Sequence, residues 1–457
     1  MKIQENLQYS TLMPAAEHVF TVSAAKLADI ERTWDPAQGA PVFTVNGRYT
    51  SRGWTDWTQG LRFGSIVLQY DATDDAAMLE LGRDRIVQQM SSHLTHTGVH
   101  DHGFNNVSTY GNLRRLALEG RFAATKWEVD YYELALAVSA AVQASRWAVT
   151  SDGSGYIYSF NGPQSLFADT IRSLRVLALG HQLNQVLMGE GDVKTSLLHR
   201  LVEHAVNTAR YNVYYGEGRD IYDVWGRVAH ESIFNTKNGQ YRCPSTQQGY
   251  SAFSTWTRGL AWIILGYAEQ LEFLINTPPQ DFPNQYTKSA VLDLCLKAAK
   301  AAADFYIANT AADGIPYWDT GAPGLVNLSD YSNKPADPYN PWEPVDSSAA
   351  AIAAQGLLRL GHFLSKHDQT GGVYTQAGLT VAQTLFQEPY LSVDANHQGL
   401  LLHSIYHRPN GWDHRPTNSN IPHSESSMWG DYHLRELAVY LIRLAKGLPY
   451  LTFFSPQ

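Results

Sequence analysis

The spacing of apolar residues constrains the fold of this chain more than any other feature. Apolar residues recur three and four positions apart along almost the whole sequence, whereas the alternation typical of β-strands is scarce. Capping residues before apolar runs, such as Asp74, Thr125 and Thr287, mark where several helices are expected to begin. About twelve helices are predicted, over residues 11–31, 58–71, 74–94, 104–120, 125–149, 168–187, 192–212, 250–272, 288–309, 346–365, 371–386 and 429–446.

These helices follow one another without a linker, a low-complexity tract or a break in composition. We therefore predict six helical hairpins closed into a double ring, an all-α (α/α)6 barrel in which residues 1–457 form a single domain. A helical solenoid is the alternative, and the lack of a fixed-length sequence repeat argues against it. The long connections 213–249, 310–345 and 387–428 are rich in Gly, Pro, Asn and aromatic residues, and connections of this length usually carry function.

The charge and hydropathy of the chain exclude several classes of partner. The net charge is −9 and neither Lys nor Arg forms a run, which argues against binding to nucleic acid or to a long polyanion. No stretch reaches about 18 consecutive apolar residues, and the first ten residues, "MKIQENLQYS", lack the apolar core of a signal peptide. We expect no contact with a membrane and a location in the cytoplasm, or in the periplasm if a signal peptide has been removed.

Polar and aromatic side chains gather where the even-numbered predicted helices begin. In a double ring, alternate helices form the inner layer, so their N-terminal ends share one rim and the side chains there line a pocket. The free N–H groups and partial positive charge of helix N-termini favour an anionic ligand, such as a sugar that carries a carboxylate. The residues at these ends are Trp57, Asp101, Asp169, Gln248, Arg258, Trp262, Asp346, Trp429 and Asp431.

A structural role is the alternative for some of these residues. Aspartate and serine are preferred helix caps, so Asp169, Asp346 and Ser347 are each compatible with capping alone. The presence of Trp, Gln and Arg at the same helix ends favours a binding site instead.

Asp101 and Asp169 are two carboxyl groups on the same predicted rim. Acid and base catalysis of glycoside cleavage requires such carboxyl groups. Burial beside aromatic rings raises the pKa of a carboxyl group and turns it into a proton donor, but the spacing does not say which of the two is the donor.

The stretch "GVHDHGF", residues 98–104, also offers a metal site, because His93 and His96 precede it by about one helical turn. The histidines lie on both sides of a break at Gly98, so we expect them to point in different directions. Motifs for zinc peptidases, nucleotide phosphates and dinucleotides are absent. We therefore expect neither a metal nor another cofactor.

Six segments, taken in order, form a specific pattern: "HDHGF", "TQQGYSAFSTWTRGLAW", "DGIPYWDTGAP", "DSSAAAIAAQGLLRL", "GLLLHS" and "WGDYHLREL". In these segments the chain resembles glycoside hydrolase family 88, the unsaturated glucuronyl hydrolases, and the related unsaturated rhamnogalacturonyl hydrolases of family 105. The resemblance extends from about Trp57 to the twelfth predicted helix, which is most of the chain.

The resemblance implies roles for individual residues. Asp169 matches the general acid and base of the family, and Asp101 matches the second essential aspartate. Phe160 stands where the family has a tryptophan and Leu260 where it has a glutamine, and both departures concern the preference for the leaving group rather than the chemistry. The predicted substrate-binding residues are Trp57, His100, Phe160, His230, Gln248, Arg258, Trp262 and Trp429.

The reaction implied by the resemblance removes a 4,5-unsaturated uronic acid from the non-reducing end of oligosaccharides made by polysaccharide lyases. Asp169 is expected to protonate C4 and then to deprotonate the water that adds to C5, with its pKa raised by the nearby charge of Asp101. The alternatives are a uronic-sugar lyase or epimerase on the same barrel, a family 105 hydrolase, and a sugar-binding protein without activity. The expected ligand is a small unsaturated oligosaccharide, and both a monomer and a homodimer remain open.

Overall fold

A computed structural model of the protein describes residues 1–367, 369–449 and 452–454. A helix or a short series of helices occupies each of the twelve predicted segments, some of them interrupted. The helices are α1 (Tyr9–Thr33), α2 (Gln59–Thr73), α3 (Ala76–Gln89), α4 (Ser91–Leu94), α5 (His102–Asn106), α6 (Asn112–Leu118), α7 (Lys126–Ser145), α8 (Thr170–Ser173), α9 (Arg175–Gln182), α10 (Leu197–Tyr211), α11 (Thr257–Leu274), α12 (Lys288–Asn309), α13 (Ser347–Lys366), α14 (Gly372–Leu385) and α15 (Met428–Ala445). The predicted (α/α)6 barrel is confirmed.

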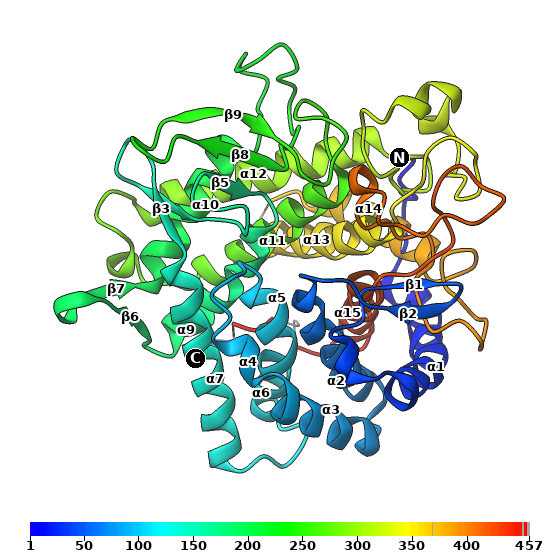
Figure 1. Ribbon diagram of the computed structural model, residues 1–457, viewed down its shortest axis with the longest axis horizontal. Helices are drawn as coiled ribbons and strands as arrows, with labels where there is room; N and C mark the ends of the chain where they lie inside the picture. Colours follow the sequence, from blue (N-terminus) through cyan, green and yellow to red (C-terminus); the bar gives the residue numbers. More distant parts are fainter. Residues whose placement is uncertain (368, 450–451, 455–457) are drawn as a thin grey trace.

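The inner ring closes because each inner element packs on the next one. Contacts run from α2 to α5, α8, α11, α13 and α15 and return to α2. Every residue of α11 is buried, whereas the outer helices α7 and α12 bury one face only. Figure 1 shows α11, α13 and α15 near the middle of the molecule and α3 and α7 on the outside.

Close contact between inner elements depends on glycine in the "HDHGF" segment. A Cβ atom at Gly103 would lie 2.1 Å from the carbonyl oxygen of Ser173, at the end of α8. Such a contact is impossible, so only glycine lets α5 approach α8 this closely. The residues that precede these two helices are Asp101 and Asp169, and the approach brings them together.

The helix starts agree with the predicted caps at Thr125 and Thr287, whose side chains accept hydrogen bonds from the first turns of α7 and α12. The predicted cap Asp74 is wrong. Asp74 ends α2 in a left-handed conformation, with φ 57°, and Asp75 caps α3 by accepting from the N–H of Ala77.

Among the described residues, short antiparallel strands form four small sheets between the helices. Residues 147–149, 186–187 and 194–196, which were predicted as helix ends, belong to these strands instead. The strands are β1 (Phe43–Val45), β2 (Arg48–Thr50), β3 (Trp147–Val149), β4 (Gly155–Ile157), β5 (Ser165–Phe167), β6 (Val186–Met188), β7 (Lys194–Ser196), β8 (Glu231–Phe234) and β9 (Tyr241–Ser245). Pairing of β5 with β8 matters for function, because the N–H of Ala168 then donates to the carbonyl of His230 at 2.8 Å. This bond brings His230 beside the residue that precedes Asp169.

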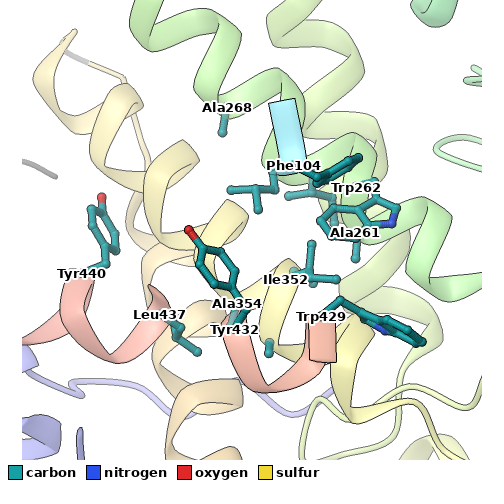
Figure 2. Packing of buried hydrophobic residues seen from close by; sticks show 14 of the residues in the cluster. Phe104, Ala261, Trp262, Ala268, Ile352, Ala354, Trp429, Tyr432, Leu437 and Tyr440 are labelled. Atoms are coloured by element: carbon teal, nitrogen blue, oxygen red, sulfur yellow. The ribbon is translucent and has the colours of Figure 1, made fainter. Parts of the chain in front are cut away.

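Apolar side chains fill the barrel, and one hydrophobic core extends from Leu12 to Phe454. Figure 2 shows part of this core, where Trp262 of α11 and Trp429 of α15 lie on the same side, with Ile352 of α13 between these helices. Among the described residues, no helix is long and apolar enough to cross a membrane.

The core also encloses an ionic cluster, which joins three inner helices. Arg172 of α8 donates to Glu436 of α15 at 2.6 Å and to Glu269 of α11 at 3.2 Å, and all three side chains are buried. The guanidinium of Arg172 also lies 5.9 Å from the ring centre of Trp262, so the cluster is directly beneath an aromatic residue of the predicted site.

Candidate active site

A pocket of about 750 Å³ opens at the end of the barrel where the inner helices begin. This is a typical size for a site that encloses a small ligand. Eight of the ten predicted site residues line the pocket, namely Trp57, His100, Asp101, Phe160, Asp169, Gln248, Arg258 and Trp262. The predicted rim of inner helix ends is therefore a real cavity.

Asp101 and Asp169 directly precede α5 and α8, and both are buried. Neither side chain forms a capping hydrogen bond to its helix. Asp346 differs, because it caps α13 through the N–H groups of Ser348 and Ala349. The capping alternative therefore holds for Asp346 but not for Asp169.

His100 lies between the two carboxyl groups. Its Nε2 atom is 3.3 Å from Oδ1 of Asp169 and 3.9 Å from Oδ1 of Asp101. The backbone carbonyl of His100 accepts from the Ser173 hydroxyl at 2.7 Å, and its ring stacks on Phe160 with the ring centres 6.0 Å apart. These contacts hold the imidazole within hydrogen-bond distance of Asp169 and close to the charge of Asp101.

Burial and neighbouring charge set the pKa values of these three groups. Burial, assisted by the charge of Asp169, raises the pKa of Asp101. Burial alone would also raise the pKa of Asp169, but the hydrogen bond and charge of His100 bring that pKa below its ordinary value. Burial opposes the charged form of His100, yet the two carboxylates outweigh it and raise the imidazole pKa. The expectation of a raised pKa at Asp169 is therefore wrong for the unliganded protein, in which His100 favours the ionised form of this carboxyl group.

Replacing Asp101 with asparagine should lower the pKa of His100. The variant removes the strongest charge that favours the imidazolium and leaves the burial that opposes it. An NMR pH titration of the His100 ring protons measures the change. Asp56→Asn is the matched control, because Asp56 lines the same pocket but is not among the groups that shift His100. An unchanged pKa in Asp101→Asn would show that the aspartate does not control the imidazole.

Arg258 and Gln248 form one wall of the pocket. The guanidinium of Arg258 donates to Oε1 of Gln248 at 2.9 Å and to Oδ2 of Asp346 at 2.9 Å. The first bond fixes the orientation of the amide and directs its Nε2 donor away from Arg258. Gln248 was predicted to open the eighth helix at residue 250, which is wrong, because α11 begins at Thr257 and Gln248 lies in the preceding loop.

His230 lies behind this loop and is not among the residues that line the pocket. Its Nδ1 atom accepts from the N–H groups of Gln247 and Gln248 at 3.1 and 3.3 Å. Burial lowers the pKa of His230 to about 4, so the imidazole is neutral near pH 7. The structure thus shows His230 holding the Gln248 loop, and its contact with a sugar stays a prediction.

Trp429 does not reach the pocket either, because its side chain is fully buried. It stacks on Trp57 with ring centres 5.3 Å apart, and its indole N–H donates to Ser348 at 3.0 Å. Trp429 therefore supports Trp57, which does line the pocket, instead of contacting the ligand itself.

The histidines near residue 98 have separate roles. His102 is buried, with Nδ1 2.9 Å from the Ser139 hydroxyl and Nε2 2.9 Å from the carbonyl of His96. Within the described part of the chain, no group of three or more His, Cys, Asp or Glu side chains is arranged to hold a metal ion.

Several pocket residues were missed by sequence reasoning. Four of them lie in the connection 387–428, whose length and composition predicted a functional loop but did not identify individual residues. The missed residues include Trp54, Trp256, Tyr406, His407, Asn410 and Trp412.

Two buried carboxyl groups in an aromatic pocket at the end of an (α/α)6 barrel are the arrangement of a carbohydrate-active enzyme. No protein-family model matches the chain. It is 28% identical over 411 residues to the unsaturated glucuronyl hydrolase of Bacillus sp. strain GL1, covering 88% of this chain and 90% of that protein. It is 27% identical over 386 residues to the unsaturated glucuronyl hydrolase of Formosa agariphila, covering 83% and 78%.

Solved structures agree with the barrel fold. The crystal structure of the Bacillus sp. GL1 enzyme matches 98% of this chain and 100% of its own with a TM-score of 0.70 at 23% identity. An unsaturated glucuronyl hydrolase specific for heparin matches 96% of this chain and 100% of its own with a TM-score of 0.71 at 20% identity. Over most of its length the chain is thus similar to the unsaturated glucuronyl hydrolases, the family that its motifs predicted, and this similarity identifies it as a glycoside hydrolase.

Proposed function

We propose that this enzyme removes a 4,5-unsaturated uronic acid from the non-reducing end of short oligosaccharides. The arrangement of Asp101, His100 and Asp169 at the buried end of the pocket supports this proposal most directly. Related enzymes have been solved as aspartate-to-asparagine mutants in complex with saccharides that begin with the unsaturated uronic acid, dGlcA-Glc-Rha-Glc in one case and dGlcA-GalNAc6S in another.

The first step requires a proton on Asp169. In the unliganded protein His100 lowers the pKa of this carboxyl group, and Nε2 of His100, whose own pKa is raised by the two carboxylates, lies 3.3 Å away. A uronate carboxylate that enters the pocket adds a second negative charge and displaces water, and both effects raise the pKa of Asp169. The proton then passes from Nε2 of His100 to Asp169, which becomes the acid.

The chemistry follows from the structure of the substrate. Asp169 gives its proton to C4, the electron pair of the C4=C5 double bond forms the new C–H bond, and positive charge develops at C5 beside the ring oxygen. Water adds to C5 and returns a proton to the Asp169 carboxylate. The hemiketal opens by cleavage of the bond from C5 to the ring oxygen, which takes up the proton of the new C5 hydroxyl, so that a ketone forms at C5 and a hemiacetal at C1. The hemiacetal then collapses to an aldehyde: the bond from C1 to the glycosidic oxygen breaks, this oxygen takes up the hemiacetal proton, and the leaving sugar is released from a 4-deoxy-5-keto uronic acid.

The pocket walls suit this substrate. Trp57 and Trp262 present aromatic faces to a sugar ring, and the Nε2 of Gln248 is a donor for its carboxylate or hydroxyls. Because the aspartates lie at the closed end, only a terminal sugar can reach them, which explains removal from the end of the chain.

Loss of ultraviolet absorbance tests the proposal, because hydration destroys the conjugated double bond. An unsaturated uronyl disaccharide should lose its absorbance and yield the free leaving sugar, whereas the saturated disaccharide should be unchanged. A lyase or epimerase would leave the double bond intact, and a sugar-binding protein would bind the disaccharide without product in mass spectrometry.

We further propose that residues 1–457 form one catalytic domain, which acts as a monomer or homodimer. The location that we propose is the cytoplasm, or the periplasm if a leader has been removed. The continuous core from Leu12 to Phe454 supports the single domain. Light scattering during size-exclusion chromatography measures the oligomeric state.

A further inference from the structure

The outer part of the pocket is lined by aromatic and uncharged polar side chains, and these side chains affect which leaving sugar the enzyme accepts. Resting on the proposed function, we propose that Trp54 and Trp412 form a stacking platform for an uncharged leaving sugar, and that this subsite discriminates against sulfate. Trp54, His407, Asn410 and Trp412 line this part of the pocket.

Trp54 is unusual in both exposure and conformation. Its side chain is 94% exposed although it lines the pocket, and its φ is 68°, in the left-handed region that a bulky residue rarely adopts. Strained backbone of this kind persists where the surroundings enforce it and is concentrated at ligand sites. An indole held in water at the rim of a sugar pocket is placed to cover the face of a second sugar ring.

Trp412 faces the same pocket from a loop that is anchored to the barrel. Its ring centre lies 5.4 Å from that of Tyr406 and 4.8 Å from that of His407. Arg52, two residues before Trp54, donates to the Trp412 carbonyl at 2.8 Å and places its guanidinium 5.6 Å from the indole centre. The two tryptophan segments are therefore tied to each other, as a common platform requires.

The charges around the pocket oppose a sulfated ligand. Of the described residues that line it, Asp56, Asp101 and Asp169 are acidic, and Arg258 is the only arginine or lysine. Arg258 is already paired with Asp346 and with Gln248. Burial lowers the pKa of His407 to about 4, so His407 is neutral near pH 7.

The connection 387–428, which carries His407 and Trp412, also contains Arg408 and Arg415. Neither arginine lines the pocket. Among the described residues that line the pocket, a sulfate on the leaving sugar would therefore find no unpaired lysine or arginine to replace the water that it loses. Burial of a charge without a partner is unfavourable.

The test compares two unsaturated disaccharides that differ only by a sulfate on the leaving sugar, together with the methyl glycoside of the unsaturated uronic acid. We expect kcat/KM for the sulfated disaccharide to be at least about ten-fold lower than for the neutral one, because unpaired or like charges at an interface cost this much or more. Equal or faster turnover of the sulfated disaccharide would overturn the inference.

The variant Trp54→Ala tests the platform without endangering the fold, because the side chain is exposed. KM for the neutral disaccharide should rise about five- to ten-fold, in keeping with the value of an aromatic contact, while the methyl glycoside should be turned over as before. Trp127→Ala is the matched control, because Trp127 is also exposed but lies on the outer helix α7. An unchanged KM in Trp54→Ala, or an equal loss on the methyl glycoside, would show that Trp54 is not part of a leaving-sugar subsite.

Trp412→Phe provides a second measurement, because it shortens the platform but keeps an aromatic ring in the loop. A smaller rise in KM than in Trp54→Ala is expected for the neutral disaccharide, and a loss on the methyl glycoside would count against the platform. Failure of the proposed function has a different signature, because then none of the three substrates would lose its absorbance in the unmodified enzyme.

Discussion

Replacing Asp169 with asparagine should lower kcat for an unsaturated disaccharide by about 10³-fold or more, with little change in substrate binding. General acid and base catalysis by one group is typically worth 10²–10⁴-fold, and in the proposed mechanism Asp169 serves first as acid and then as base. Asparagine has nearly the same shape but can neither deliver nor accept the proton. The decay of ultraviolet absorbance measures kcat, and calorimetry with the inactive variant measures binding.

Asp130→Asn is a suitable control for this variant, because Asp130 is an exposed residue of α7, paired with Lys126 and outside the pocket. Normal turnover in Asp169→Asn would contradict the assignment of the acid. Loss of binding together with turnover would instead assign Asp169 to recognition of the sugar.

Replacing Glu436 with glutamine should lower the free energy of unfolding by about 3–5 kcal/mol, the usual cost of removing one partner from a buried ion pair. Glu436 accepts from Arg172 at 2.6 Å, and its other oxygen lies 3.7 Å from Arg175. With glutamine at this position, the buried guanidinium groups of Arg172 and Arg175 would share one carboxylate, that of Glu269. Urea unfolding followed by circular dichroism measures the change.

Glu17→Gln is the matched control, because Glu17 forms an ion pair with Lys446 at 3.1 Å in which both side chains are more than two-fifths exposed. Exposed pairs of this kind contribute about 0–1 kcal/mol. Equal effects of the two variants would mean that the buried cluster adds nothing beyond an ordinary surface pair.

The same cluster predicts how stability depends on pH. Burial raises the pKa of Glu436, but Arg172 and Arg175 outweigh it and bring the pKa from its ordinary 4.5 to about 2. A group whose pKa is lowered by folding stabilises the protein fully above its unfolded pKa and loses that contribution as the pH falls. In the unmodified protein this contribution is therefore lost between about pH 4.5 and 2, and Glu436→Gln should show a weaker decline over that range.

Local patterns account for what could be predicted from the sequence. Helix periodicity needs only neighbouring residues, so all twelve helical segments and the closed double ring were predicted, and the helix starts placed Asp101 and Asp169 on one rim. The start of α11 was misplaced, because the segment before it bonds to a distant residue. The N–H of Tyr250 donates to Asp319 at 2.8 Å, which favours a loop over the helix expected from residue 250.

The electrostatics of the site lay beyond sequence reasoning. The direction in which the pKa of each aspartate is shifted depends on where His100 points, and its Nε2 lies closer to Asp169 than to Asp101. His230 is brought to the site by the pairing of β5 with β8, and the hydrogen bond from Arg52 to Trp412 joins the segments that carry Trp54 and Trp412.

The sequence by itself thus determined the barrel, the family and the carboxyl pair, because apolar periodicity and short motifs are local properties of the chain. Only the tertiary structure decided the opposite pKa shifts of that pair and the walls of the pocket. These features arise from distances between residues far apart in sequence, and a pKa or a stacking contact changes with each ångström of such a distance.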